Sequence, residues 1–285
     1  MDVISTVSTI QEKIMQLKAT GKTVGFVPTM GFLHEGHLSL VEKAKNENDI
    51  VIMSIFVNPL QFGPNEDFDR YPRDIKRDTM LAIEAGVDIL FHPQVEDMYP
   101  EPLSMKVIVE KGVNVLCGKT RPGHFDGVAT VVLKLFQIVM PTRAYFGMKD
   151  AQQVAVIENM IRDFHLPVQL VRCETLREKD GLAKSSRNVY LLPQERDEAA
   201  VLYESLHTAK KRILEGETCV TTVKKEMKDL IEKKTSSSID YVEILSYPQL
   251  APIQEKDGEI IIAIAVKFSK ARLIDNLIVL KGGNN

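Results

Sequence analysis

The first 175 residues alternate between short apolar runs and helix-length stretches, and this alternation constrains the fold more than any other feature. The apolar runs, which are of strand length, are residues 23–29, 49–59, 87–93, 143–147 and 167–176. The helical stretches are residues 37–48, 73–86, 127–141 and 150–165. Continuous apolar strands that alternate with helices predict a parallel sheet covered on both faces. In such sheets, ligands bind beyond the carboxyl ends of the strands, near a switch in strand order.

The composition changes after about residue 176, which predicts a second, smaller α+β domain. Charged amphipathic helices are expected at 193–216 and 219–234, and strands at 239–247 and 259–268. We therefore expect a first domain over residues 1–175 and a second over 176–285. A chain of 285 residues is long enough for two such domains.

The N-terminus and the cysteines indicate a cytoplasmic protein. Residues 1–22 lack the basic start and continuous apolar core of a signal peptide. They predict an amphipathic helix with Val7, Ile10, Ile14 and Leu17 on one face. Cys117, Cys173 and Cys219 show neither metal-ligand nor redox spacing, so we expect small packing residues in a reducing compartment. The net charge of −3 predicts no binding to nucleic acid or membrane, and any site for an anion must concentrate positive charge locally.

The stretch "MGFLHEGH" places His34 and His37 three residues apart, where a strand gives way to a helix. On a helix these positions share a face, near the backbone N–H groups at the positive end of the dipole. Such a place favours phosphate, and Gly31 and Gly36 allow close approach by a ligand. The alternative is two unrelated surface histidines. The spacing is poor for zinc, because no Cys or acidic third ligand is near.

Three further stretches contain polar side chains suited to phosphates or a hydroxy acid. "GLAKSSRN" combines Lys184 and Arg187 with two serines in a glycine-bounded loop, although a solvated basic loop is the common alternative. "FGMKDAQQ" offers Lys149 for a phosphate and Asp150 for Mg²⁺ or simply for a helix cap. In "FVNPLQF", the amide of Gln61 can both donate and accept hydrogen bonds, though a glutamine alone says little.

Taken in order, these stretches resemble the pantoate–β-alanine ligase (pantothenate synthetase) family over nearly the whole chain. The resemblance also includes "RPGHFDGVATVVLKLF" and "ARLIDN". "HEGH" is similar to the H-x-G-H signature of the wider nucleotidyltransferase superfamily, which includes class I aminoacyl-tRNA synthetases, and "KSSR" is similar to its mobile lysine-serine loop. "VNPLQF" and "KDAQQ" point to the narrower family.

The resemblance implies a Rossmann-like first domain, a smaller C-terminal lid domain and a homodimer. It implies catalytic roles for His34, His37 and Lys149, with His37 matching the family's proton donor. Gln61 and Gln153 match the pantoate contacts, and Gln61 also matches the β-alanine position. The implied ATP contacts are Met30, Gly31, Phe32, Leu33, His34, Glu35, Gly36, His37, Gly147, Met148, Lys149, Asp150, Leu176, Lys184, Ser185, Ser186 and Arg187. Many members carry an acidic residue in place of Met148, so only a backbone contact is carried over at that position.

The chemistry implied by the resemblance is ATP-dependent joining of pantoate to β-alanine through a pantoyl adenylate, with release of AMP and pyrophosphate. Mg²⁺ is expected mainly on the ATP phosphates, with no dedicated protein metal site. Two rivals remain open at this point. One is another adenylyl- or cytidylyltransferase with the same histidine loop, and the other is a nucleotide-binding regulator without catalysis.

Overall fold

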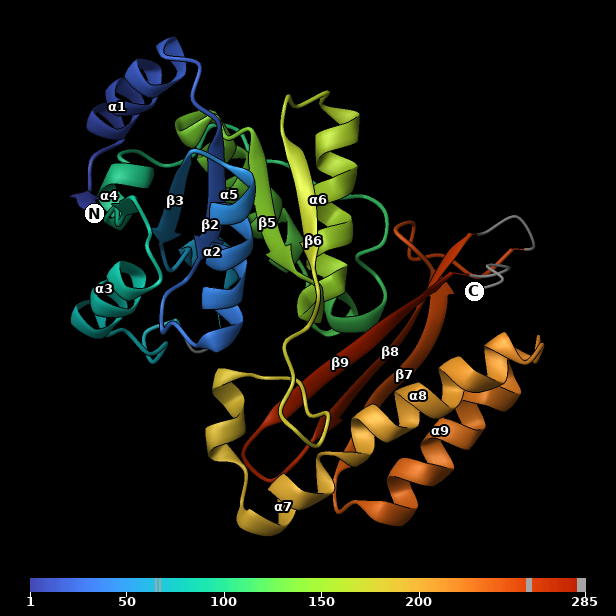
Figure 1. The fold of residues 1–285 in the computed structure, drawn as a ribbon. Helices are drawn as coiled ribbons and strands as arrows, with labels where there is room; N and C mark the ends of the chain where they lie inside the picture. The colour runs from blue at the N-terminus through green and yellow to red at the C-terminus, as the bar shows by residue number, and fades with distance from the viewer. Residues whose placement is uncertain (65, 67, 255–257, 281–285) are drawn as a thin grey trace. The chain divides into compact units, whose positions relative to one another are not determined.

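The computed structural model describes residues 1–64, 66, 68–254 and 258–280 (Figure 1). The chain forms two compact units, each with its own sheet. The first unit comprises residues 1–110, 121–147 and 156–173. The second comprises residues 111–120, 148–155 and 174–285. One division between the units falls after Cys173, and two shorter segments, residues 111–120 and 148–155, pack with the second unit.

The first unit contains a six-stranded parallel sheet with the strand order β1-β4-β3-β2-β5-β6. Its strands are β1 (Asp2–Ile4), β2 (Val24–Thr29), β3 (Ile50–Ile55), β4 (Ile89–Phe91), β5 (Arg143–Gly147) and β6 (Gln169–Cys173). Strands β3 and β4 lie on one side of β2, and β5 and β6 lie on the other. The order therefore switches between β2 and β5, and the histidine segment follows the first of these two strands.

Helices cover both faces of this sheet, which confirms the predicted parallel α/β architecture (Figure 1). The helices and short helical turns are α1 (Val7–Ala19), α2 (Glu35–Glu47), η1 (Pro59–Gln61), α3 (Ile75–Glu84), α4 (Val95–Met98), η2 (Leu116–Thr120), α5 (His124–Val139), η3 (Met148–Asp150) and α6 (Ala151–Asp163). On one face, Val41 and Ala44 of α2 pack with Val27 and Met53 of the sheet. Helix α5 contacts β2 and α1 and is buried along most of its length, as its apolar sequence predicts.

The second unit has a three-stranded antiparallel sheet in the order β7-β8-β9. Its elements are η4 (Ser186–Tyr190), α7 (Pro193–Glu198), α8 (Val201–Leu214), α9 (Val220–Lys234), β7 (Ser238–Ser246), β8 (Glu259–Lys267) and β9 (Arg272–Leu280). Leu202 and Leu206 of α8 pack against Ile262 and Ile264 of β8 in a core on one face. A second cluster on the other face contains Ile261 with Leu116 and Ala151, so the two short segments belong to this unit by packing.

Several sequence predictions need correction. The single helix expected at 193–216 is divided into α7 and α8, because Leu202 N–H donates to the carbonyl of Ala199 in a tighter three-residue turn. Strands β1 and β9 and helix α4 were not expected. Cys173 is buried as expected, but Cys219 is exposed and therefore is not a core packing residue. Within the described ranges, no helix is both long and apolar enough to cross a membrane.

Candidate active site

His34 and His37, in the segment after β2, hold the first turn of α2 together. His34 is the N-cap of α2, and its Nδ1 accepts a hydrogen bond from the backbone N–H of Gly36 at 3.1 Å. The Nδ1 of His37 accepts from the backbone N–H of His34 at 3.3 Å, and the ring centroids are 4.1 Å apart. A neutral imidazole whose Nδ1 accepts carries its hydrogen on Nε2. Each ring therefore has an Nε2–H that can donate to an anionic oxygen.

Gly36 is needed for this capping arrangement. A Cβ at this position would lie 2.9 Å from Cε1 and 3.0 Å from Nδ1 of the His34 ring. Any side chain here would therefore push the imidazole away from the helix start. The sequence suggested Gly36 as a point of close approach for a ligand. In the structure, the His34 ring is what requires a glycine at this position.

A buried carboxylate shapes the backbone just before the histidines. Asp78 of α3 is only 1% exposed, and its carboxylate accepts from the N–H groups of Phe32 at 2.7 Å and Leu33 at 2.8 Å. Gly31 has φ +84°, and a Cβ there would meet Ile55 Cγ2 at 2.9 Å and Asp78 Oδ2 at 3.0 Å. The turn is thus preformed by long-range contacts. Both N–H groups already donate to Asp78, so we expect any contact of ATP with Phe32 or Leu33 to use other atoms of these residues.

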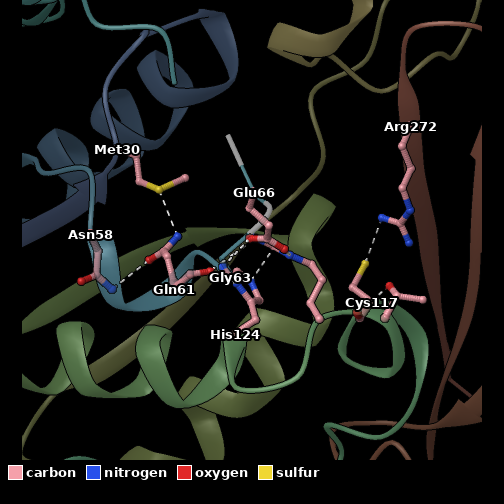
Figure 2. A network of polar contacts seen from close by, with 10 residues as sticks. Met30, Asn58, Gln61, Gly63, Glu66, Cys117, His124 and Arg272 are labelled. Atoms are coloured by element: carbon pink, nitrogen blue, oxygen red, sulfur yellow. Dashed lines mark hydrogen bonds and ion pairs between the residues drawn. The ribbon is translucent and has the colours of Figure 1, made fainter. Parts of the chain in front are cut away.

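Gln61 lies at the end of η1 with its side chain held by neutral partners. It is 8% exposed, and its Nε2 lies 3.0 Å from Met30 Sδ (Figure 2). Asn58 Nδ2 donates to Gln61 Oε1 at 3.2 Å, and Tyr99 OH donates to Asn58 Oδ1 at 2.9 Å. A Cβ on Gly127 would collide with the Leu60 carbonyl oxygen, so only glycine lets α5 pack this closely against η1. The structure therefore brings Met30 and Gln61 together.

The backbone of Gln61 is held by a second network (Figure 2). Its carbonyl accepts from His124 Nδ1 at 2.8 Å, so this ring carries its hydrogen on Nδ1. His124 Nε2 then accepts from Arg121 Nη1 at 3.0 Å. Arg121 also forms a bidentate ion pair with Glu66, with both N–O distances at 2.6 Å. This guanidinium holds the pKa of the Glu66 carboxyl below its usual range.

A cavity of about 290 Å³ lies beside the same turn in the first unit. Met30, Gly31 and Phe32 line it, together with Arg73 of the 62–74 connection and His92 after β4. The lining includes neither His34, His37 nor Gln61. The cavity therefore borders the turn without containing the side chains that the sequence singled out.

In the second unit, η3 presents Lys149 at the start of α6. Lys149 Nζ lies 3.7 Å from Asp150 Oδ2, and Asp150 is the more exposed of the two. Asn276 of β9 donates from Nδ2 to the carbonyls of Met148 at 2.9 Å and Lys149 at 3.0 Å. The Met148 side chain packs against the apolar cluster around Leu116, which accounts for an apolar residue at this position.

Two neighbouring glutamines in the first turn of α6 have different surroundings. Gln152 is buried, and its Nε2 donates to the carbonyls of Gly112 and Val115, both at 2.9 Å. Its Oε1 accepts from the Gly118 N–H at 3.3 Å, so Gln152 orders the segment before η2. Gln153 is half-buried. Among the described hydrogen bonds, the Gln152 amide bonds to three backbone groups, whereas none of this kind involves the Gln153 amide.

The loop that carries Lys184 folds back on residue 176. The Lys184 N–H donates to the Leu176 carbonyl at 2.9 Å, and Arg177 and Ala183 form an isolated β-bridge. Lys184 Nζ lies 3.8 Å from Glu178 Oε2. Ser185 is the N-cap of η4, where its Oγ accepts from the Arg187 N–H at 3.3 Å. The structure therefore brings the expected residues Leu176 and Lys184 into direct contact.

The remaining expected site residues lie in these same elements. Glu35 is the exposed first residue of α2, and Gly147 is the last residue of β5. Ser186 begins η4, and Arg187 beside it is exposed. The second unit thus contributes the cationic side chains Lys149, Lys184 and Arg187 to the expected set, and the first unit contributes the imidazoles and the amide of Gln61. Within the described parts of the chain, no three His, Cys, Asp or Glu side chains cluster so as to hold a metal ion.

These features can be compared with those of known proteins. A parallel α/β unit whose H-x-G-H sequence caps the helix after β2, together with a lysine-serine loop, is similar to the nucleotidyltransferase superfamily. The model of one family, described as pantoate-beta-alanine ligase, matches residues 2–278. The chain belongs to that family.

Individual relatives agree with this assignment. A curated pantothenate synthetase from Geobacillus sp. (strain WCH70) is 61% identical over 97% of this chain and 98% of its own. The crystal structure of pantothenate synthetase from Thermus thermophilus has a TM-score of 0.89 at 47% identity, covering 97% of this chain and 99% of its own. A pantoate-beta-alanine ligase from Francisella tularensis, complexed with beta-gamma ATP and beta-alanine, has a TM-score of 0.77 at 35% identity, covering 100% and 99%.

Sequence reasoning did not single out the residues that hold the site in place. Asp78, Asn58 and His124 act within the first unit, and Asp275 and Asn276 act within the second. Asn58 and His124 lie in stretches that carried the family resemblance, but nothing in their local pattern indicated a partner. A polar pair inside an otherwise apolar strand was the one available signal for Asp275 and Asn276.

Proposed function

We propose that the chain catalyses ATP-dependent condensation of (R)-pantoate with β-alanine to give pantothenate, AMP and pyrophosphate, a step in the biosynthesis of pantothenate (vitamin B5) and coenzyme A. Membership of the pantoate–β-alanine ligase family supports the reaction. The structural observation that carries the proposal is the histidine pair at the start of α2, in which both Nδ1 atoms accept backbone hydrogen bonds. This arrangement puts the hydrogen of each ring on Nε2, an atom that can donate to a phosphate oxygen.

In the first step, a pantoate carboxylate oxygen attacks the α-phosphorus of ATP. The bond from that phosphorus to the bridging oxygen breaks, and pyrophosphate leaves with the electron pair. The nucleophile is already ionised, so in-line positioning and neutralisation of the developing charge provide the catalysis. We assign the first role to Gln61 and Gln153 and the second to His34, His37, Lys149, Lys184 and Arg187.

The other ATP contacts come from the turn Met30–His37, from Gly147 to Asp150, from Leu176 and from Ser185 and Ser186. The beta-gamma ATP and beta-alanine in the complex of the Francisella tularensis ligase support this assignment of substrates. Mg²⁺, which we expect mainly on the ATP phosphates, would supply further positive charge. Asp150 is a single exposed carboxylate, which fits an ion held mainly by the nucleotide and water.

In the second step, the neutral amine of β-alanine attacks the acyl carbon of pantoyl adenylate. The bond from that carbon to the AMP oxygen breaks, and the nitrogen loses one proton. Gln61 would contact the incoming β-alanine as well as pantoate. The adenylate must be protected from water, and we propose that the second unit, with the Lys184 loop, serves as a lid. We further propose a cytoplasmic homodimer.

The proposed reaction is tested by incubating the purified chain with ATP, Mg²⁺, pantoate and β-alanine and identifying the products. Pantothenate and AMP should form in equal amounts, and only when all substrates are present. Formation of ADP would indicate an acyl phosphate instead. Transfer of a nucleotide to another acceptor would favour a different nucleotidyltransferase, and binding of ATP without turnover would favour a regulator.

A further inference from the structure

Asp275 and Asn276, two neighbouring residues of β9, point to opposite faces of the second unit's sheet. Successive residues of a strand alternate between faces. Leu273 and Val279, in the same phase as Asp275, pack in the core with α8 and α9. Ile278, in the same phase as Asn276, packs against the cluster that contains Ala151. The two polar side chains therefore reach different segments from adjacent points on one backbone.

Asn276 holds the segment that contains Lys149. The side chain is 7% exposed, and Nδ2 donates to two successive carbonyls, those of Met148 and Lys149, at 2.9 and 3.0 Å. One amide group thus fixes the direction of two consecutive peptide units. Because these peptide units flank the Lys149 Cα, the bonds restrict the path from which its ammonium group extends.

Asp275 holds the loop that contains Lys184. It is 3% exposed and forms a bidentate ion pair with Arg177, whose Nη1 and Nη2 lie 2.6 and 2.9 Å from the two carboxylate oxygens. Arg177 Nη1 also donates to the Gly181 carbonyl at 3.0 Å, and the guanidinium lies 4.1 Å from the centroid of the Tyr203 ring. A planar, bidentate contact of this kind restrains both position and orientation.

Gly181 completes the anchor of this loop. It has φ +91°, and a Cβ there would collide with the Tyr203 ring. The loop therefore packs its backbone directly on the tyrosine that Arg177 also contacts. Arg177 and Ala183 pair as a β-bridge, so restraint at Arg177 is passed directly to the residue before Lys184.

We infer that Asp275 and Asn276 are positioning residues, which fix the segments of Lys149 and Lys184 relative to each other through β9. The inference rests on the proposed function, in which both ammonium groups act on the same nucleotide. The Cα atoms of Asp275 and Asn276 are about 3.8 Å apart, as in any pair of neighbours joined by a trans peptide. The segments of Lys149 and Lys184 are therefore both attached to nearly one point of β9. A substitution far from the reacting atoms that misplaces a catalytic group by about 1 Å can lower the rate about 100-fold.

The inference requires a specific pattern of coupling. Asn276 acts through Lys149, and Asp275 acts through Lys184. Effects of independent residues on a rate multiply, whereas a residue that acts only through a second one has no further effect once the second is removed. A residue with only a general structural role would lower activity equally in every background.

The experiment measures pantoate-dependent exchange of labelled pyrophosphate into ATP for single and double variants whose folding is checked by circular dichroism. Asn276→Ala should lower the exchange rate about 100-fold in the wild-type background and in Lys184→Ala, but less than about threefold in Lys149→Ala. Ile278→Ala is the matched control, because it removes packing from the same face of the same strand. It should leave the exchange rate within about threefold of the wild type.

Asp275→Asn should show the reciprocal pattern, with its effect retained in Lys149→Ala and lost in Lys184→Ala. If this variant fails to fold, Arg177→Lys replaces it, because lysine keeps the charge and removes only the bidentate fork. Equal loss in all backgrounds, or an equal loss in Ile278→Ala, would overturn the inference. Absence of exchange and of pantothenate with the wild-type chain would instead refute the proposed function, and so the two failures are distinguishable.

Discussion

The histidine segment of the first unit and the lysine segments of the second unit differ in charge and in how the chain holds them. In the first unit, the described contacts of the His34, His37 and Gln61 side chains are with neutral groups, and they include N–H bonds to imidazole nitrogens. In the second unit, two side chains of β9 hold the lysine segments. The Asn276 amide bonds directly to the segment of Lys149, and the Asp275 carboxylate holds the loop of Lys184 through Arg177.

Adenylate formation involves two tasks that have different electrostatic requirements. Neutral donors and acceptors can read the hydroxyl groups of a small acid without competing for its charge. Cations are needed on the phosphates, but two ammonium groups close together repel each other. Each of the two segments is anchored through atoms other than the ammonium group, and each ammonium lies near one carboxylate, that of Asp150 for Lys149 and that of Glu178 for Lys184.

Loss of His37 should have the largest effect, because it removes one donor from the transition state. For His37→Ala we expect the adenylation rate to fall by about two to four orders of magnitude. ATP affinity, measured by calorimetry, should change much less. His207→Ala, at an exposed position of α8, is the control. A near-normal rate for His37→Ala would contradict a role in the transition state.

Loss of Asp78 should have the next largest effect and should act on folding. Asp78→Ala leaves the N–H groups of Phe32 and Leu33 without their acceptor. We expect the free energy of unfolding to fall by about 2–4 kcal/mol. Urea denaturation followed by circular dichroism measures this change. Unchanged stability would mean that other contacts hold the turn that precedes the histidines.

The two glutamines of α6 provide a matched pair with a smaller effect. Gln153→Ala should raise the KM for pantoate about tenfold and leave ATP binding almost intact, because one hydrogen-bonding partner is lost. Gln152→Ala should instead lower the melting temperature, since it frees three backbone groups near η2. If Gln153→Ala weakened ATP binding as strongly as pantoate binding, Gln153 would belong to the nucleotide site.

The ion pair between Arg121 and Glu66 should have the smallest effect, and one that depends on pH. The Glu66 pKa is lowered from its ordinary value of 4.5, first by its hydrogen bond with Arg121. Its contribution is therefore complete above that value and is lost as the pH falls through the lowered pKa. Glu66→Gln should cost about 1 kcal/mol near pH 7. The difference from wild type should shrink below about pH 4.5. A constant difference down to about pH 3 would contradict the assignment.

The strand and helix pattern of the first unit was largely readable from the sequence because its strands are buried on both faces and its helices have clear apolar periodicity. Strand β1 was missed because it is three residues long and stands directly before α1. Strand β9 was missed because Asp275 and Asn276 interrupt its apolar pattern, and only distant partners make their burial favourable.

The same limit applies to the site. His34, His37 and Gly36 are close in sequence, so local spacing indicated their role as a group. Asp78 lies 45 residues from Leu33, and Asn276 lies 127 residues from Lys149, so no local pattern could connect them. Sequence periodicity reports which face is buried, but it does not report which buried polar groups meet.

The most direct test of the central claim is the exchange of labelled pyrophosphate into ATP by the wild-type chain with Mg²⁺ and pantoate but without β-alanine. Formation of pantoyl adenylate is expected to be reversible, because the mixed anhydride that forms is about as activated as the phosphoanhydride that breaks. The account predicts clear exchange that disappears when pantoate is omitted. Production of pantothenate without any pantoate-dependent exchange, with pyrophosphate shown to leave before β-alanine binds, would contradict it.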